Sequence, residues 1–386
     1  MTAWTSSVAC TRAELLALRD EWSRLAESGG ADSLFSTPEW QLSWFDAIGD
    51  EVIPRVATAR DASGALRALL PMALRSRGSG LRRTMVLELS GESVACGDHL
   101  GLIALPADRE EAWGTLVKVL DQCAAAADVV RFASMDEGSS RAMAVRNLNE
   151  RNWRQTVQAT DIAPRVALSG GGAAFDVSLS SHYRKRVRSY ARSFDAAHPA
   201  AEFRRHGDTV SLRAAMDALY ALHAARWPRG GVLDQPTMRR FLEVFSQTAD
   251  ARGWLRVYHI AIDERMIAVL LAVHWHGTAS YFQSGWDPAF AKWNVAELLV
   301  VHAIREAAHE GCHTFDFLRG GEPYKLRFPV TSPALRTDEW VCSRRGHRVA
   351  AVETLLGAAW HSARRWRTRA KRLLASTRPS FNKAES

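Results

Sequence analysis

The sequence predicts an α/β fold, of the α+β kind with mixed sheets, in two consecutive halves. Apolar residues at helical spacing alternate along the chain with short strand-like runs, as expected for mixed structure. Three glycines at 170–172 separate the halves. The 386 residues are 47% hydrophobic and 24% charged, which excludes global disorder. No apolar run approaches the roughly 18 residues of a membrane span.

The first half is expected over residues 1–165. Leu15, Leu18 and Trp22 share one side of a helix, and Pro38 suits the first position of the next. The turn residues at 61–64 join two strand-like runs into a hairpin. The predicted elements are helices at 12–27 and 37–44, strands at 55–59, 65–74, 82–90 and 99–105, a helix at 107–127 and a strand at 129–134.

The second half is expected over residues 175–345. Its predicted elements are helices at 178–198, 212–227, 236–251 and 295–310, and strands at 202–206, 254–262, 266–275, 279–286, 314–318 and 337–344. Three antiparallel strands are thus followed by a loop at 287–294, a helix and a strand. The N-terminus of a helix after a strand attracts anions through its free N–H groups. A plain strand–helix connection is the alternative.

The excess positive charge is confined to the C-terminal tail. Residues 343–386 contain eleven Lys or Arg and two Asp or Glu, a net charge of +9, so the rest of this +8 protein carries −1. A basic surface spread over the body is therefore not expected, nor a DNA partner. Within residues 346–386, apolar and basic residues alternate at helical spacing from Leu356 to Leu373. This predicts a basic amphipathic helix in peripheral contact with an anionic membrane, or else one packed on the body.

The cysteines and histidines indicate neither a disulfide framework nor a metal site. The five cysteines are scattered and form no Cys-x-x-Cys pair, and the thirteen histidines show no metal-ligand spacing. We therefore expect a cytoplasmic location and no bound metal. The sequence also lacks a Gly-x-x-x-x-Gly-Lys loop, a His-Glu-x-x-His motif and a Gly-x-Ser-x-Gly elbow.

The densest group of reactive side chains begins at Asp316. This residue stands between two phenylalanines on a predicted strand and therefore points to the face opposite their rings. The glycine-rich turn after it carries Arg319, Glu322, Tyr324 and Lys325. An acid, a phenol and an ammonium held together can transfer protons or bind a charged substrate. A buried ion-pair network is the alternative.

Two predicted helices carry further candidates. His223, Arg226 and Trp227 share a face at the C-terminal end of one helix, so His223 and Arg226 can reach the same ligand. A cation stabilised by the helix dipole is the alternative. On the helix at 178–198, a stripe that includes Arg184 and Arg188 suits phosphate, or is simply a solvated face.

These sequence segments resemble those of one protein family. Together with Thr-Pro-Glu-Trp at 37–40, the segments at 181–188, 222–227 and 315–328 look like those of GNAT-superfamily acyltransferases associated with cellulose biosynthesis, the CelD/BcsL type. The similarity covers roughly residues 34–330. That family is similar to Fem-type aminoacyl transferases, which have two GNAT-like folds in tandem.

The resemblance implies tandem GNAT-like domains at 1–165 and 175–345, followed by the helical tail at 346–386. It also implies an acyl-CoA donor bound where the strand at 279–286 meets the following helix. The donor-binding candidates are Gln283, Ser284, Lys292 and Asn294. The glycine-containing pyrophosphate loop of ordinary GNAT enzymes is replaced by Asp-Pro-Ala-Phe-Ala-Lys-Trp-Asn at 287–294, so an acyl carrier or aminoacyl-tRNA donor stays open.

We expect an N-acyltransferase that acts on an amine of a cell-envelope, lipid or polysaccharide precursor. Asp316 or Glu322 is the candidate base or amine anchor, with His223 as a competing base. Tyr324 is the candidate acid, and Lys325 would stabilise developing negative charge. The substrate-binding candidates are Tyr183, Arg184, Arg188, Arg226, Trp227 and Arg319. O-acylation, Fem-like transfer from aminoacyl-tRNA and a non-catalytic binding protein are the alternatives.

Overall fold

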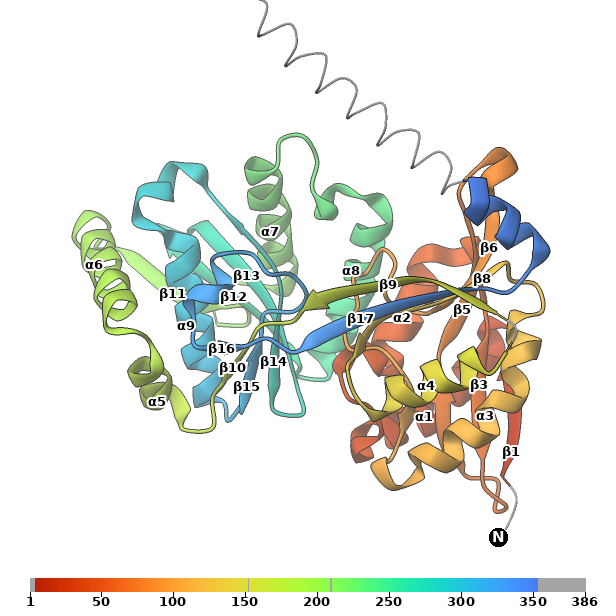
Figure 1. The fold of residues 1–386 in the computed structure, drawn as a ribbon. Coiled ribbons are helices and arrows are strands. Elements are labelled where there is room, and N and C mark those ends of the chain that lie inside the picture. The colour runs from red at the N-terminus through yellow and green to blue at the C-terminus, as the bar shows by residue number, and fades with distance from the viewer. Residues whose placement is uncertain (1–3, 152, 209, 353–386) are drawn as a thin grey trace, which may run out of the picture.

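The computed structural model describes residues 4–151, 153–208 and 210–352, which form two α/β halves lying side by side (Figure 1). The predicted amphipathic helix from Leu356 to Leu373 lies outside the described residues. Within the described ranges, no helix is both long enough and apolar enough to cross a membrane.

In the described part of the first half, helices pack against two sheets. The helices are α1 (Arg12–Leu25), α2 (Pro38–Ile48), α3 (Arg109–Ala124) and α4 (Ser139–Asn149). The strands are β1 (Thr5–Ala9), β2 (Val52–Pro54), β3 (Val56–Arg60), β4 (Leu66–Leu70), β5 (Met72–Arg77), β6 (Thr84–Leu89), β7 (Ile103–Ala104), β8 (Val129–Asp136) and β9 (Arg154–Ile162). One sheet has the order β1-β3-β4-β7, and in the other β6 runs parallel to β8.

From residue 201 onwards, the second half repeats the element order of the first half: a strand, two helices, antiparallel strands, a helix and a parallel strand. The helices are α5 (Gly171–Ser178), α6 (Ser181–Ala197), α7 (Leu212–Arg226), α8 (Pro236–Ala251) and α9 (Val295–His309). The strands are β10 (Arg165–Ala167), β11 (Ala201–Arg205), β12 (Leu255–Ile262), β13 (Arg265–Trp275), β14 (Thr278–Trp286), β15 (Thr314–Asp316), β16 (Val330–Thr331) and β17 (Ala334–Val341). Its sheet has the order β11-β12-β13-β14-β15-β10-β16, and β14 runs parallel to β15.

The strands are not divided between the sheets as the ranges 1–165 and 175–345 suggest. β17 leaves the second half and inserts between β8 and β9 of the first, giving a sheet of order β2-β5-β6-β8-β17-β9. There Asp338, almost fully buried, forms a bidentate ion pair with Arg141. In the other direction, β10 follows β9 directly and pairs with β15 and β16. The halves therefore cannot separate without breaking sheet pairing.

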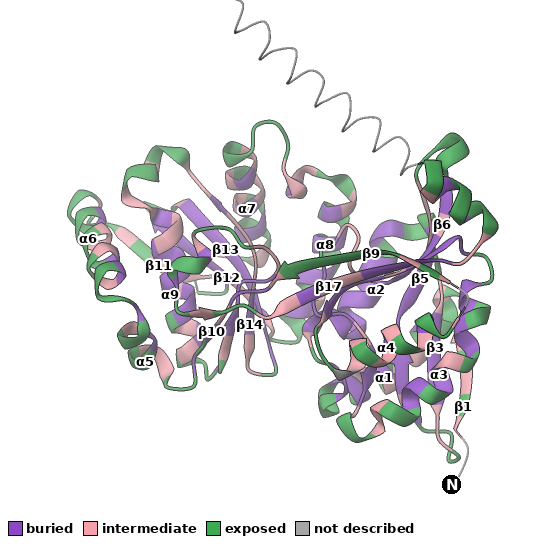
Figure 2. Ribbon diagram, in the orientation of Figure 1, coloured by how far each residue is buried: buried purple, intermediate pink, exposed green. Residues whose placement is uncertain are grey.

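A shared aromatic core also joins the halves. α2 begins after Thr37, whose hydroxyl caps the backbone N–H of Trp40, and this places the Trp40 indole against α8 of the second half. Its ring meets those of Phe241, Phe245 and Phe282 at centroid distances of 4.7, 4.8 and 5.5 Å. The central strands of both halves are buried, whereas β9 and the outer sides of α5 and α6 are exposed (Figure 2).

Two elements have other bounds in the structure than the sequence predicts, and both differences affect the site. The helix expected at 178–198 is broken at Leu179, whose backbone is extended, and α6 begins only after Ser180 caps it. The strand expected at 99–105 is reduced to β7, because the residues before it form a loop at 90–102. That loop turns towards the second half.

Candidate functional site

The site lies where two parallel strands part. β14 pairs with β15 only from Thr278 to Ser280, opposite Thr314 to Asp316. β14 continues to Trp286, whereas β15 ends and the chain turns away. Side chains of the unpaired part of β14 therefore face open space, and two cavities occupy it.

The first cavity, which we call the α9 cavity, has a volume of about 200 Å³ and lies at the N-terminus of α9. Asn294, Val295 and Ala296 line it with the start of that helix, where free N–H groups attract anions. Glu297 in the same turn would oppose this, but Arg186 and Arg327 pair with it at 3.2 and 3.0 Å. The helix terminus thus remains suited to a negatively charged ligand.

The second cavity, the interdomain cavity, has a volume of about 720 Å³ and is lined by both halves. Cys96 and Asp98 come from the loop at 90–102 of the first half. From the second half, α7 contributes His223 to its wall, and the segment after β15 contributes Glu322. This volume lies within the range of small-molecule binding sites.

The two cavities share one wall, formed by Arg226, Tyr281, Ser284 and Tyr324. The Tyr281 hydroxyl lies 2.6 Å from Ser284 Oγ. Burial raises the pKa values of Tyr281 and Tyr324, so both phenols carry their protons at neutral pH. The Arg226 guanidinium rests against the rings of Trp227 and Trp286, and no carboxylate among the described residues forms an ion pair with it.

A bulge in β14 lies at this wall. Leu271 of β13 pairs with Gln283 and Ala272 pairs with Tyr281, so Phe282 is left without a partner. A bulge frees backbone groups and redirects them, and bulges are frequent at active sites. Phe282 lines the interdomain cavity, so its unpaired backbone is a candidate donor to a ligand there.

His223 is a base held in the neutral state. Its side chain is 3% exposed, and burial lowers its pKa. Its Nδ1 has no hydrogen-bond partner within the described residues. The ring fits only because glycine occupies 231: a Cβ there would stand 2.1 Å from His223 Cε1.

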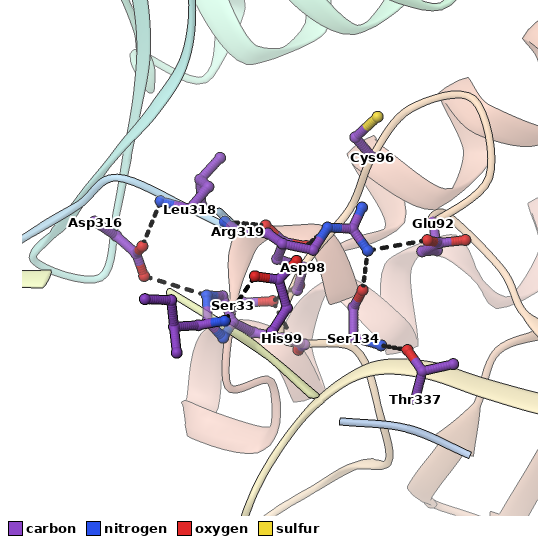
Figure 3. Close-up of polar contacts among 12 residues, drawn as sticks. Ser33, Glu92, Cys96, Asp98, His99, Ser134, Asp316, Leu318, Arg319 and Thr337 are labelled. Atoms are coloured by element: carbon purple, nitrogen blue, oxygen red, sulfur yellow. Dashed lines mark hydrogen bonds and ion pairs between the residues drawn. The ribbon is translucent and has the colours of Figure 1, made fainter. Parts of the chain in front are cut away.

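Asp316 lines neither cavity. It is 2% exposed, and Oδ2 binds Arg165 Nε at 2.7 Å and His99 Nε2 at 3.2 Å, while Oδ1 accepts from the Leu318 backbone N–H (Figure 3). Burial opposes its ionisation, but His99 and Arg165 hold its pKa below the usual range. A carboxylate with both oxygens engaged and a lowered pKa is a poor base, so its geometry does not suit the catalytic role expected from the sequence.

Arg319 and Lys325 shape the turn after β15. The Arg319 guanidinium reaches into the first half, where Nη1 donates to Glu92 and to Ser134 Oγ (Figure 3). Lys325 is 4% exposed, and its Nζ donates to the carbonyls of Leu318 and Arg319 and pairs with Glu322. Both cations border the interdomain cavity, but their donors already bind protein groups. We therefore expect them to stabilise the wall of the cavity rather than to bind a ligand.

The structure brings most of the sequence-predicted residues together. The residues that line a cavity are His223, Arg226, Trp227, Gln283, Ser284, Asn294, Arg319, Glu322, Tyr324 and Lys325. The residues that line neither are Asp316, Tyr183, Arg184, Arg188 and Lys292. Tyr183 packs against Phe328, Arg188 lies on the exposed side of α6, and the Lys292 ammonium sits over the Trp293 ring.

Several lining residues were missed by sequence reasoning. Tyr281 and Trp286 belong to a strand that the sequence predicts, but strict alternation would place residues five apart on opposite faces. The bulge at Phe282 brings both to the same cavity. The pairing of Arg186, rather than Arg184 or Arg188, with Glu297 depends on how α6 packs on α9. Asp98 and Cys96 carry no sequence signal, since they come from the other half of the chain.

The first half does not repeat the open site. Its parallel pair β6 and β8 also parts, but the loop at 90–102 fills the gap: the Leu100 N–H donates to the Ser134 carbonyl at 3.1 Å. The indoles of Trp40 and Trp44 hold the loop through the carbonyls of Gly91 and Ser93. This half therefore supplies a wall to the site of its neighbour.

We expect stability to fall as pH rises from about 6.5 to 9. Burial opposes protonation of His99, and Arg165 also touches its ring, but hydrogen bonds to Asp136 and Asp316 raise its pKa to about 9. In the unfolded chain, His99 loses its proton above its ordinary pKa of about 6.5, whereas in the folded protein it keeps that proton up to about pH 9. The stabilisation due to protonated His99 is therefore complete below pH 6.5 and is lost as the pH rises through 9. Denaturant unfolding at several pH values measures the effect. His99→Gln should flatten the slope, and an unchanged slope would contradict the assignment.

Comparisons with known proteins found one family model and several similar folds. The family model for the acetyltransferase (GNAT) domain matches residues 181–326. The structure of FemX is similar over 82% of this chain and 95% of its own, with 10% identity and a TM-score of 0.60. The C-terminal domain of a putative lysylphosphatidylglycerol synthetase from Agrobacterium fabrum covers 89% of this chain and 96% of its own, with 10% identity and a TM-score of 0.52. The L-PGS structure from Bacillus licheniformis covers 88% and 96%, with 14% identity and a TM-score of 0.52.

No curated protein matches the sequence. The match to the GNAT acetyltransferase domain model lies within the second half. The predicted α/β fold class with mixed sheets is confirmed. At these identities the similarity of the three structures concerns the fold alone.

Proposed function

We propose that this protein transfers an acyl group from acyl-CoA to an amine. The observation that carries the proposal is the meeting of two cavities at the wall of Arg226, Tyr281, Ser284 and Tyr324. In this arrangement the α9 cavity takes the thioester end of the donor, and the interdomain cavity takes the acceptor. A precursor of the cell envelope, a lipid or a polysaccharide is the acceptor class that the family resemblance suggests.

The residues at the wall support a direct transfer. The amine nitrogen attacks the thioester carbonyl carbon, and the carbon–sulfur bond breaks. His223, neutral because of its burial, takes the proton that the amine loses. Tyr324 keeps its proton at neutral pH and gives it to the leaving thiolate. Backbone N–H groups near the bulge at Phe282 stabilise the oxyanion between these steps.

The residues present fit CoA only in part. The N-terminus of α9 suits an anionic group such as its pyrophosphate, and Arg226, which pairs with no carboxylate of the described residues, lines the same cavity. The α9 cavity, at about 200 Å³, is smaller than the roughly 300 Å³ of typical ligand pockets, so it cannot hold the whole donor. The remainder of the donor would lie outside, near exposed Lys292. We also keep, as part of this proposal, a cytoplasmic location and peripheral contact of the tail at 346–386 with anionic membrane.

Thermal unfolding with acetyl-CoA, a long-chain acyl-CoA and free CoA tests the donor. A ligand at about 100 times its dissociation constant should stabilise the protein by about 2.7 kcal/mol. We expect a shift that differs among the three, and thiol release when a primary amine is added. Arg226→Ala should reduce the shift.

The other outcomes separate the alternatives. A shift without thiol release on a broad panel of amines and alcohols would indicate a binding protein without turnover. The absence of a shift with any of the three compounds would overturn acyl-CoA as the donor and favour a carrier protein or aminoacyl-tRNA.

A further inference from the structure

We infer that Asp98, contributed by the first half, anchors the acceptor as a cationic primary amine in the interdomain cavity. This inference rests on the proposed function for the reaction, but the binding that it describes can be measured without turnover. It makes the acceptor site a joint product of both halves. It also separates amine acceptors from hydroxyl acceptors.

Asp98 is a buried carboxylate with an unused acceptor. It lines the interdomain cavity and is 2% exposed. Oδ2 accepts the Arg319 backbone N–H at 2.8 Å, whereas Oδ1 has no hydrogen-bond partner in the described residues. The nearest cation to Oδ1 is Arg319 Nε at 3.5 Å. A buried carboxylate oxygen in this state is costly unless a ligand supplies a donor.

The neighbouring cations act on Asp98 without donating a hydrogen bond to Oδ1. The Arg319 guanidinium, 3.5 Å from Oδ1, is shared with Glu92 and Ser134, which it contacts at 3.1 and 2.7 Å. Lys325 is bound by two carbonyls and Glu322. A cationic ligand in the cavity would supply the donor that Oδ1 lacks.

The loop at 90–102 presents Asp98 at the expense of backbone strain. Val94, Cys96 and His99 all have positive φ angles, of 69°, 56° and 54°, in a region that residues with side chains rarely adopt. The indoles of Trp40 and Trp44 and the Ser33 hydroxyl fix the loop in this shape. Such strain is concentrated at functional sites, where the surrounding structure maintains it.

The other half contributes a group that can accept a proton. His223 lines the same cavity, and within the described residues its buried Nδ1 has no hydrogen-bond partner. An ammonium offers three N–H donors and a positive charge, whereas a hydroxyl offers one donor and no charge. The ammonium binds Asp98 and passes one proton to His223, which releases it to water. The neutral amine then attacks, and His223 is free to take the second proton that the nitrogen loses. Burial raises the pKa of Asp98, but the bound ammonium favours its charged form, and this form then stabilises the imidazolium.

The kinetic test compares Asp98→Asn with Asp136→Asn. Asp136 belongs to the same interdomain network through His99 but lines neither cavity, so it controls for a loss of stability. Asp98→Asn should raise KM for a primary amine about 10- to 100-fold, the range given by losing a hydrogen bond to a charged group, with kcat less affected. Asp136→Asn should leave KM unchanged. Equal KM values for Asp98→Asn and the unmodified protein would overturn the inference and leave the acyltransferase proposal standing.

A binding test works even if no donor is found. Cys96 is exposed and lines the cavity, so its rate of maleimide labelling reports on occupancy, with half-buried Cys10 and Cys342 as internal references. We expect 2-phenylethylamine to slow labelling of Cys96 and 2-phenylethanol to have no effect. Asp98→Asn should abolish the protection and Asp136→Asn should retain it. Equal protection by both compounds, protection by neither, or protection that survives Asp98→Asn would overturn the inference.

Discussion

Replacing His223 with glutamine is expected to lower kcat about 10²- to 10⁴-fold, the usual contribution of a positioned general base. Glutamine preserves most of the volume beside Gly231 and Gly285, the glycines that leave room for this residue. It cannot accept a proton at neutral pH. Binding of acyl-CoA should persist, because His223 lies on the interdomain cavity and not on the α9 cavity.

The pH profile distinguishes a base from a packing residue. Burial lowers the pKa of His223, so kcat/KM of the unmodified protein should fall only when the pH drops below about 6.5, where an ordinary histidine titrates. His223→Gln should lose this acidic limb. A second limb at higher pH, due to the amine itself, should remain in both proteins.

His259 provides a matched control. It is another fully buried histidine whose pKa is lowered by burial, but it lies in β12 and lines neither cavity. His259→Gln should change stability and leave the acidic limb in place. If His223→Gln retained normal turnover and its acidic limb, His223 would not be the base, and Glu322 would become the strongest candidate.

The helices and strands of the second half could be predicted because the sequence patterns that determine them are local. The helix expected at 236–251 coincides with α8, and the three strands before the helix at 295–310 lie within a residue or two of β12, β13 and β14. Hydrophobic periodicity and turn residues decide such elements within one window of sequence. The grouping of Glu322, Tyr324 and Lys325 after β15 follows for the same reason.

What the sequence could not show depends on pairing between distant segments. The run at 337–344 reads as a strand, but nothing in it says that β17 joins the sheet of the first half beside β8. β9, exposed along most of its length, gives no apolar alternation to recognise. Asp98 becomes part of the site because β10 and β17, together with the aromatic core around Trp40, hold the two halves together.

Removing the charge of Asp316 is expected to destabilise the protein rather than to inactivate it. Asp316→Asn leaves Arg165 and His99 without the carboxylate that both contact, and His99 is almost fully buried. We expect the free energy of unfolding to fall by about 3 kcal/mol, the lower end of the range for breaking a buried ion pair, because Arg165 stays partly in water. Denaturant unfolding at pH 7 measures this loss.

The contrast with Glu322 makes the prediction decisive. Glu322 lines the interdomain cavity and its side chain is 55% exposed, so Glu322→Gln should leave stability nearly unchanged. For Asp316→Asn, kcat per folded molecule should stay within about threefold of the unmodified value, since the carboxylate touches neither cavity. Loss of turnover with unchanged stability would instead show that Asp316 takes part in the chemistry. Because β10 carries Arg165 and the loop at 90–102 carries His99, a large loss of stability would mean that Asp316 joins the two halves around the site.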